Sequence, residues 1–465
     1  MTTPPKKISL VEWTERYPLL KREGLREPSY GGPLERHLQD GDVRLRRLRF
    51  DNSPAALRLW NFLLTEEDRL AQARAEGKLL VGAMKDLGTV PVMAYSLPNV
   101  VAFYPDGAWW IPCVMEMSDK LLAIADSLGI DDSFCPVRAM LGAFLNCEHF
   151  PVPDLLISSA GAVCDDFSAI AQRLEHLGYP IVWWELAHRR LPEKAEEGIV
   201  LPGGFTAPAE QLQFVKAELE RVRKLLEERS GEPLSDARLS EGIRAANRVR
   251  GLLRRLREEV FSAPRCPLPA LEMLIAEMLA IHFCSDREES VAVLTDLLGE
   301  ARRRTDAGEG VLPEDAARIF WVNPVADLRA MNLLEECGGR ICGTEYLFRH
   351  ALEKIPEDRP PMEALAAMAL SDPMAGPAED RASRICDEAR AFGCEAVIIS
   401  RIPGASHCAF EGSVIREIVE ERLGLPVAEF EVPPISDSLS LAVRTRMEAL
   451  IETIRERRAH VLHRD

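Results

Sequence analysis

The stretch P-D-L-L-I-S-S-A-G-A-V-C-D-D-F-S-A-I-A-Q-R-L, residues 153–174, changes its periodicity part of the way along. Its first residues, Pro153 to Ser158, form an apolar run with the length of a buried strand. After Asp166 the apolar residues recur with helical spacing, and a second apolar run follows at 180–184. The order strand, helix, strand predicts a βαβ unit, in which Cys164 lies between the first strand and the helix.

A similar order recurs near the C-terminus. The run C-E-A-V-I-I-S-R-I (394–402) predicts a buried strand, the segment P-G-A-S-H-C (403–408) a loop, and residues 411–423 a helix before a strand at 425–430. Cys164 and Cys408 therefore occupy comparable places at the carboxyl ends of parallel strands. Open α/β sheets build their ligand sites at that edge, so we regard both cysteines as candidate ligands.

The pattern along the chain predicts an α/β protein with two parallel-sheet domains and a helical region between them. We expect strands at 78–84, 89–95, 100–104 and 318–322, and helices at 119–128, 326–336, 381–392 and 439–458. Residues 191–208 are interpreted as a linker and residues 351–379 as an irregular segment. The expected division is a mostly helical lead-in (1–77), an N-terminal α/β domain (78–208), a helical domain (209–310) and a C-terminal α/β domain (311–465).

Composition narrows the class of protein. The 465 residues are 47% hydrophobic and 28% charged, with a formal net charge of −17. An acidic chain is a poor partner for nucleic acid or for an anionic membrane surface, because both attract cationic groups. No apolar stretch reaches transmembrane length, and the N-terminus has no apolar signal core. We expect a cytoplasmic protein without nucleic-acid or membrane partners.

The eleven cysteines are dispersed and include no C-x-x-C pair, which argues against a disulfide framework. Cys135 stands out in F-C-P-V-R-A-M-L-G (134–142), because Pro136 favours the first turn of a helix. A cysteine at a helix N-terminus is expected to favour the thiolate, the form that binds metal. Three dispersed thiolates suit an iron–sulfur cluster better than zinc, and the fourth iron of a cubane would keep an open coordination site for Lewis-acid chemistry.

Over roughly residues 78–455, the chain resembles the 2-hydroxyacyl-CoA dehydratase / benzoyl-CoA reductase family, in the class of its D-component-like subunits. The family's first cysteine motif is similar to F-C-P-V-R-A-M-L-G, and its second is similar to L-L-I-S-S-A-G-A-V-C-D-D-F. Asn247 and Arg250 match an Asn-x-x-Arg helix, and V-R-T-R-M-E-A-L-I-E (443–452) matches the closing helix.

The resemblance implies two Rossmann-like parallel-sheet domains joined by a helical region, with a [4Fe–4S] cluster held by Cys135, Cys164 and Cys408. It implies an anaerobic enzyme, either a 2-hydroxyacyl-CoA dehydratase (a lyase) or an acyl-CoA reductase, in which the cluster performs low-potential one-electron transfer to an acyl-CoA thioester. The implied partners are a second homologous subunit in a homo- or heterodimer, an ATP-dependent iron–sulfur activator protein, and the acyl-CoA substrate.

Three other functions remain open. A double-cubane reductase of small molecules would need further cysteines, for which the candidates are Cys113, Cys147, Cys337 and Cys342. A non-catalytic partner subunit would keep the fold without turnover, and the loop before Cys408 is longer than the short turn of the family. A zinc-stabilised binding protein would need a fourth ligand such as His407.

Three groups of neighbouring residues, His407, Ser158–Ser159 and Arg138, have two interpretations each. His407 is a candidate proton donor for a leaving hydroxyl, or a histidine bonded locally to the loop. Ser158–Ser159 would tune a cluster through hydrogen bonds to sulfur, or cap the turn. Asp165–Asp166 complement the start of the following helix. Arg138 would bind a phosphate or balance an anionic cluster, or form an ordinary salt bridge.

Overall fold

The fold is taken from a computed structural model. It describes residues 4–9, 11–12, 15, 18, 21–22, 48–84, 87–105, 118–282, 285–324, 328–402, 404–432 and 437–462. Cys113, one of the cysteines considered for a second cluster, lies outside these residues, as do residues 23–47 of the expected helical lead-in.

The N-terminal domain is built on a four-stranded parallel sheet with the order β4-β3-β5-β6. Its central strands are apolar and almost wholly buried, as expected for a parallel sheet that helices cover on both faces. The strands are β3 (Leu79–Met84), β4 (Val100–Phe103), β5 (Leu155–Gly161) and β6 (Ile181–Leu186), and the helices are α6 (Thr89–Tyr95), α8 (Ser118–Ser127), α9 (Ala139–Asn146) and α10 (Asp165–His176).

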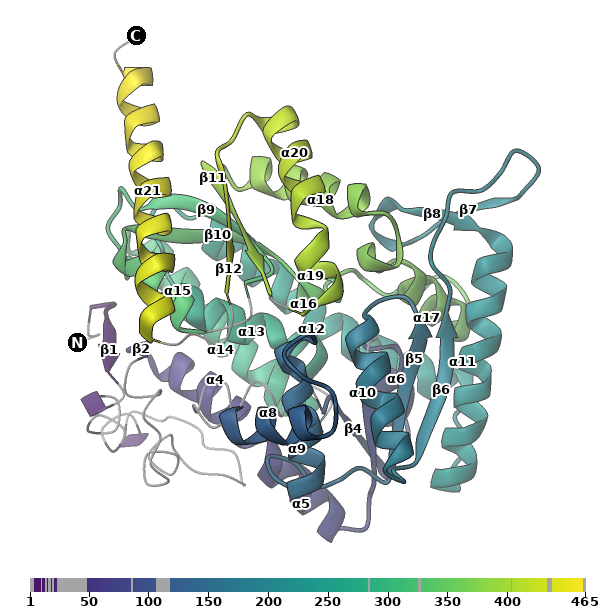
Figure 1. Cartoon of the computed structure of the whole chain (residues 1–465). Coiled ribbons are helices and arrows are strands. Elements are labelled where there is room, and N and C mark those ends of the chain that lie inside the picture. The colour runs from purple at the N-terminus through teal and green to yellow at the C-terminus, as the bar shows by residue number, and fades with distance from the viewer. Residues whose placement is uncertain are drawn as a thin grey trace.

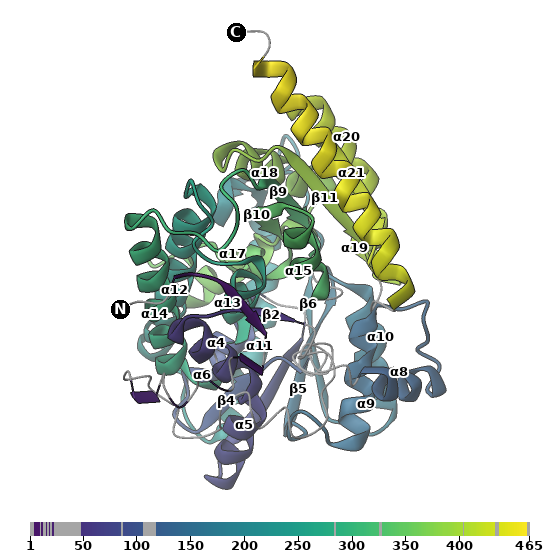
Figure 2. The same ribbon diagram turned by 90° about the vertical axis from the view of Figure 1, so that its left-hand side faces the viewer.

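The C-terminal domain repeats this plan with the parallel order β10-β9-β11-β12. The long helix α21 packs along β12 and β9 and projects beyond the sheet (Figure 2). The strands are β9 (Ala317–Val322), β10 (Gly339–Glu345), β11 (Ala396–Arg401) and β12 (Val427–Glu431), and the helices are α15 (Arg329–Glu336), α16 (Leu347–His350), α18 (Ala378–Ala391), α19 (Ser406–Phe410), α20 (Gly412–Leu423) and α21 (Asp437–Leu462).

Numbered within each domain, both sheets have the strand order 2-1-3-4, which confirms the prediction of two parallel-sheet domains. The order reverses between the first and third strands, and such sheets bind ligands outside the carboxyl ends of the strands at that point. Cys164 follows the third strand of the first sheet, and Cys408 follows the third strand of the second. The two cysteines are therefore equivalent in topology.

In chain order, a helical region lies between the two sheets (Figure 1), where long amphipathic helices were expected. These helices are α11 (Ala209–Ser230), α12 (Asp236–Ser262), α13 (Ala270–His282) and α14 (Arg287–Asp306). Near the N-terminus, β1 (Lys7–Ser9) pairs with β2 (Arg49–Asp51). Helices α4 (Pro54–Leu64) and α17 (Pro361–Leu370) pack against the helical region, and α5 (Glu66–Ala75) packs against β3 of the first sheet.

Three predictions of local structure outside the cysteine segments were wrong. Residues 89–95 form helix α6 rather than a strand, because Gly88 turns the chain at φ 83° and all seven residues are buried, so packing outweighs their strand propensity. The supposedly irregular segment 351–379 contains α17, which begins at Pro361 in the first helical turn. The supposed linker contains a two-stranded sheet, β7 (Gly198–Val200) and β8 (Thr206–Pro208).

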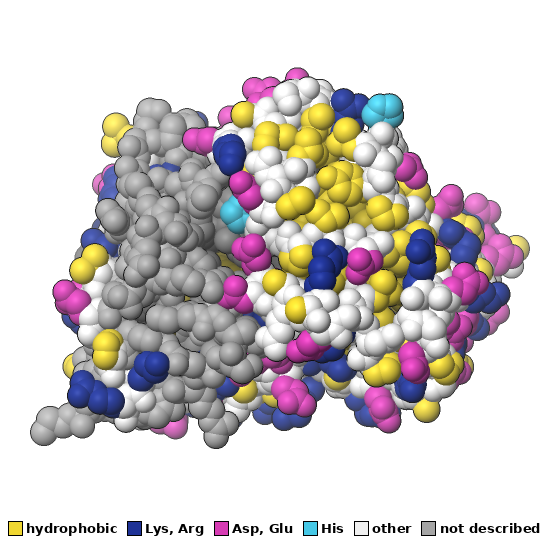
Figure 3. All heavy atoms as spheres, turned by 90° about the horizontal axis from the view of Figure 1, so that it is seen from below, with side chains coloured by type: hydrophobic (Ala, Val, Ile, Leu, Met, Phe, Trp, Pro, Cys, Tyr) yellow, Lys and Arg dark blue, Asp and Glu magenta, His cyan; other side chains and the backbone are white. Residues whose placement is uncertain are grey.

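The surface mixes apolar and charged side chains. On the face seen from below, hydrophobic side chains gather on one part of the surface, with Lys, Arg, Asp and Glu around them (Figure 3). Among the helices that the structure describes, none combines the length and the apolar character needed to span a bilayer.

Candidate functional site

Cys164 lies at the start of α10, in the turn that follows β5. The turn needs a glycine, because Gly161 has φ 85° and a Cβ there would come within 2.5 Å of the Leu186 carbonyl oxygen. Cys164 is half-buried, and its Sγ lies 3.6 Å from Oδ2 of Asp166. The strand-to-helix turn thus directs the thiol to the carboxyl edge of the first sheet.

Cys135 precedes a short 3₁₀ turn, Pro136–Arg138, that leads into α9. Its backbone N–H donates to Oδ1 of Asp166 at 3.0 Å. Asp166 is 3% exposed, so one buried carboxylate holds the segments of Cys135 and Cys164 together. Asp166 lies in the first turn of α10, as the sequence predicted, but the link that it makes between the two cysteines was missed.

Cys408 comes from the other domain. It lies within the short helix α19, so the prediction that it belongs to a loop was wrong. Gly404, at φ 78°, precedes this helix, and a Cβ on it would fall 2.3 Å from the carbonyl carbon of Phe134. The chain before Cys408 therefore touches the residue before Cys135, and both views place α19 beside the α9–α10 region (Figures 1 and 2).

Burial raises the pKa of the Cys135 thiol well above its ordinary value, and the nearby thiols of Cys164 and Cys408 raise that pKa further. Burial also raises the pKa of Cys408 to about 12, where the Cys164 thiol acts in the same direction and Arg381 opposes it. The three sulfurs therefore share one environment. The expectation that the helix start would favour a Cys135 thiolate is wrong for the protein without metal, because desolvation and like charges dominate.

Other predicted residues have local partners. His407 pairs through Nδ1 with Oε1 of Glu411 at 3.2 Å, which agrees with the local interpretation. Arg138 is buried and forms the ordinary salt bridge, 3.3 Å from Asp126. Ser158 is fully buried in β5, where its hydroxyl lies 3.5 Å from the Ser159 carbonyl oxygen.

The cysteines considered for a second cluster lie elsewhere. Cys147 is exposed at the end of α9, and Cys337 follows α15. Cys342 is buried in β10, where its carbonyl oxygen is 3.6 Å from Sγ of Cys394. Neither Cys147, Cys337 nor Cys342 is among the groups that most strongly shift the pKa of Cys135 or Cys408. Across the described residues, no group of three or more His, Cys, Asp or Glu side chains could hold a single metal ion.

Sequence reasoning also missed a buried polar group beside Cys408. Asn323 directly follows β9 and Glu345 ends β10, so both lie at the carboxyl edge of the second sheet. Arg381 of α18 bonds both side chains. The polar residues at the ends of two neighbouring parallel strands could have indicated this buried group. The strand pattern gives no sign that an arginine from a helix distant in sequence would join them.

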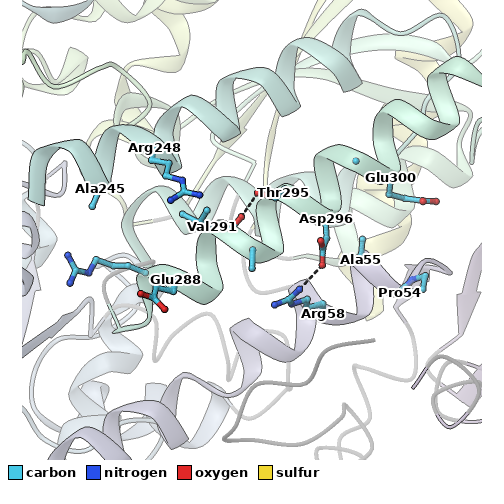
Figure 4. Close-up of a pocket in the computed structure, with 13 residues that line it drawn as sticks. Pro54, Ala55, Arg58, Ala245, Arg248, Glu288, Val291, Thr295, Asp296 and Glu300 are labelled. Carbon is cyan, nitrogen blue, oxygen red and sulfur yellow. Dashed lines mark hydrogen bonds and ion pairs between the residues drawn. The ribbon is translucent and has the colours of Figure 1, made fainter. Parts of the chain in front are cut away.

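A separate cleft of about 1110 Å³ lies between α4, α12 and α14 (Figure 4). In it Arg58 points toward Asp296, to which it bonds at 2.6 Å, and it also pairs with Glu289 at 2.6 Å. Neither cysteine nor histidine is among the lining residues that the structure describes, so the cleft is distinct from the cysteine site.

The fold and site define a class: a protein with two α/β domains of equal strand order, in which three cysteine thiols lie close enough to affect one another's pKa. The family model described as 2-hydroxyglutaryl-CoA dehydratase, D-component, matches residues 95–454. The chain belongs to this family, which is one of dehydratase components of the 2-hydroxyacyl-CoA dehydratase type, and the matched region contains all three cysteines. No curated protein matches the chain.

Proposed function

We propose that this chain is the iron–sulfur subunit of a 2-hydroxyacyl-CoA dehydratase or benzoyl-CoA reductase-like enzyme, with a [4Fe–4S] cluster held by Cys135, Cys164 and Cys408. The observation that carries the proposal is the convergence of three thiols: Cys164 and Cys408 follow equivalent strands of the two sheets, and Cys135 precedes α9. Burial, and after it the neighbouring thiols, raise the pKa values of Cys135 and Cys408, and a cationic metal group would favour the thiolate forms that bind it.

A cubane suits this donor set better than a single ion. Each thiolate of a cubane binds a different iron, so its ligands are spread more widely than those of one zinc ion. When bound, such a cluster would supply low-potential one-electron transfer to an acyl-CoA thioester.

The chain's own residues have supporting roles in this proposal. Asp166 fixes the Cys135 and Cys164 segments, and the burial of Cys408 limits the access of water. His407, half-buried beside Glu411, is placed to hold a proton near the site and is our candidate for protonating a leaving hydroxyl.

The proposed partners are a second homologous subunit, an ATP-dependent iron–sulfur activator protein and an acyl-CoA substrate, in an anaerobic cytoplasmic setting. Family membership supports these partners. The gathering of hydrophobic side chains on the face in Figure 3 supports a partner subunit, because apolar surface of this kind is commonly covered by another chain.

Anaerobic purification, with iron and sulfide counts and EPR spectroscopy, tests the proposal. We expect about four irons per chain, as in one cubane. About eight irons would indicate a double cubane, and zinc without iron would refute the cluster. Turnover of candidate 2-hydroxyacyl-CoA and aromatic acyl-CoA esters, with and without an ATP-dependent activator, then separates a dehydratase, a reductase and a non-catalytic partner subunit.

A further inference from the structure

Beside Cys408 lies a buried ionic group centred on Arg381. This arginine is 1% exposed, although long charged side chains are almost never fully buried unless they are paired. Its guanidinium grips Glu345 with two hydrogen bonds, Nε to Oε1 at 3.0 Å and Nη2 to Oε2 at 2.7 Å. Nη2 also donates to Oδ1 of Asn323 at 3.0 Å. Arg381 thus joins the ends of β9 and β10.

The other side of the guanidinium faces the cysteine segment. Nη1 donates to Oε2 of Glu411 at 2.5 Å, and Oε1 of the same carboxylate pairs with His407. Glu411 lies three residues after Cys408, so Arg381 ties the sheet edge to the segment that bears the cysteine. Four of the five guanidinium N–H groups are accounted for by these bonds among the described residues.

Stability alone is a weak reason for this arrangement. A buried ion pair often contributes no more than apolar side chains of the same size, because both charges lose their water. Arg381 is also tied to the cysteine segment, because it bonds Glu411 and the same carboxylate pairs with His407, the residue next to Cys408. The guanidinium therefore places a fixed positive charge within the field of a candidate cluster ligand.

We propose that Arg381 is a positioning residue that sets the charge at Cys408 and so raises the reduction potential of the cluster proposed above. The inference rests on the proposed function. Reduction adds one electron, and hence one negative charge, to the group that Cys408 holds, and a buried cation nearby stabilises that form. Glu411 acts in the opposite sense through its negative charge and also fixes the position of the guanidinium.

The test is an EPR-monitored redox titration of the full chain with assembled cluster, in which a titanium(III) complex supplies the electron. Arg381→Met removes the charge, and we expect at least a tenfold smaller ratio of reduced to oxidised cluster at a given potential, equal to about 59 mV for one electron. Arg381→Lys keeps the charge and should restore most of the difference.

Arg384→Met is the matched control. Arg384 lies on the same helix and also forms a salt bridge, but its partner is Glu353, which is not part of the segment that bears Cys408. Its removal should leave the potential unchanged. Glu411→Gln removes a negative charge and should shift the potential upward, the direction opposite to Arg381→Met, whereas general loosening of the site would not give opposite signs.

The outcomes separate the two proposals. If the wild-type chain takes up no iron, the proposed function fails. If the cluster assembles and both Arg381→Met and Glu411→Gln keep the wild-type potential, the role of Arg381 is refuted while the cluster stands. If Arg381→Met does not fold or load iron, Glu411→Gln decides, and an unchanged or lower potential in that variant overturns the inference.

Discussion

At the scale of single residues, Asp166 does more than its sequence position suggests. A carboxylate in the first turn of a helix usually complements the N–H groups at the start of that helix. The Asp166 carboxylate also accepts a hydrogen bond from the backbone N–H of Cys135 and lies beside the Cys164 thiol. The bond spans 31 positions of the chain, and the sequence contains no marker for it.

We predict that Asp166→Ala lowers the iron bound per chain by several-fold after anaerobic reconstitution, because the N–H of Cys135 loses its acceptor and the two cysteine segments separate. The lost hydrogen bond should also lower the free energy of unfolding by about 1–3 kcal/mol. Asp165→Ala is the control, since Asp165 is exposed at the neighbouring position. Equal iron content in both variants would contradict the role of Asp166.

His350 is buried between two carboxylates, with Nε2 2.5 Å from Glu345 and Nδ1 3.1 Å from Asp372. Burial disfavours its charge, but these carboxylates raise its pKa above the ordinary value of 6.5. A raised folded-state pKa means that the stabilisation is complete below about pH 6.5 and is lost as pH rises through the folded-state pKa.

We therefore predict that the free energy of unfolding of the wild-type protein falls as the pH rises through the folded-state pKa of His350. The free energy of unfolding of His350→Gln, whose side chain cannot be charged, should fall less. Urea unfolding at several pH values from about 6, below the ordinary histidine pKa, upward measures the difference. Parallel pH curves for the two proteins would show that His350 does not carry the dependence.

At the scale of elements, the approach of α19 to the first domain depends on Gly404. An alanine there would be strained at φ 78° and would also meet the backbone of Phe134. We predict that Gly404→Ala separates Cys408 from Cys135 and reduces iron binding, as metal analysis of the reconstituted chain would measure.

Gly424→Ala is the matched control for this variant. Gly424 has a similar φ of 62°, but a Cβ added at that position would have no neighbouring atom within 4 Å. Both variants carry the left-handed cost of about 1–2 kcal/mol, and only Gly404→Ala adds a collision. A similar loss of iron in both would attribute the effect to backbone strain rather than to the contact.

Elements were predictable where burial and periodicity agree. The strands β3, β5, β9 and β11 are continuous apolar runs, and their sequence pattern located each within a few residues. Residues 89–95 misled because threonine, valine and tyrosine favour strands, whereas here Gly88 and burial on every side select a helix. The short helix α19 was missed because Pro403 and Gly404 are typical of a loop.

At the scale of the whole molecule, α12 connects the parts. Asn247 bonds both backbone groups of Ile355, at 2.9 Å each, and Glu357 at 2.8 Å. Arg250, one turn later, donates to the carbonyl oxygens of Glu353 at 2.8 Å and Leu87 at 2.5 Å. The Asn-x-x-Arg motif therefore braces the helical region against both domains.

We predict that Asn247→Ala lowers the free energy of unfolding by about 1–3 kcal/mol, because the backbone groups of Ile355 lose their bonds. Ser240→Ala, on the same helix, should change it far less, since the Ser240 hydroxyl donates to the Asp236 carbonyl oxygen of its own helix. Chemical denaturation of both variants checks this, and equal effects would deny the motif a bracing role.

The sequence located most of the candidate site because internal repetition makes Cys164 and Cys408 equivalent, and because Pro136 marks the helical turn after Cys135. It could not locate Arg381 or the link through Asp166. Both depend on contacts between side chains from distant elements, which follow from how the domains pack and leave no local pattern.

The most direct test of the central claim is the iron and acid-labile sulfide content of Cys164→Ser, purified anaerobically beside wild type and Cys147→Ser. Cys147 is exposed and is not among the groups that most strongly shift the pKa of Cys135, so its variant should match wild type. We predict that Cys164→Ser folds, as judged by circular dichroism, and loses the cluster with its brown absorption. Wild-type iron and sulfide in folded Cys164→Ser would contradict the account.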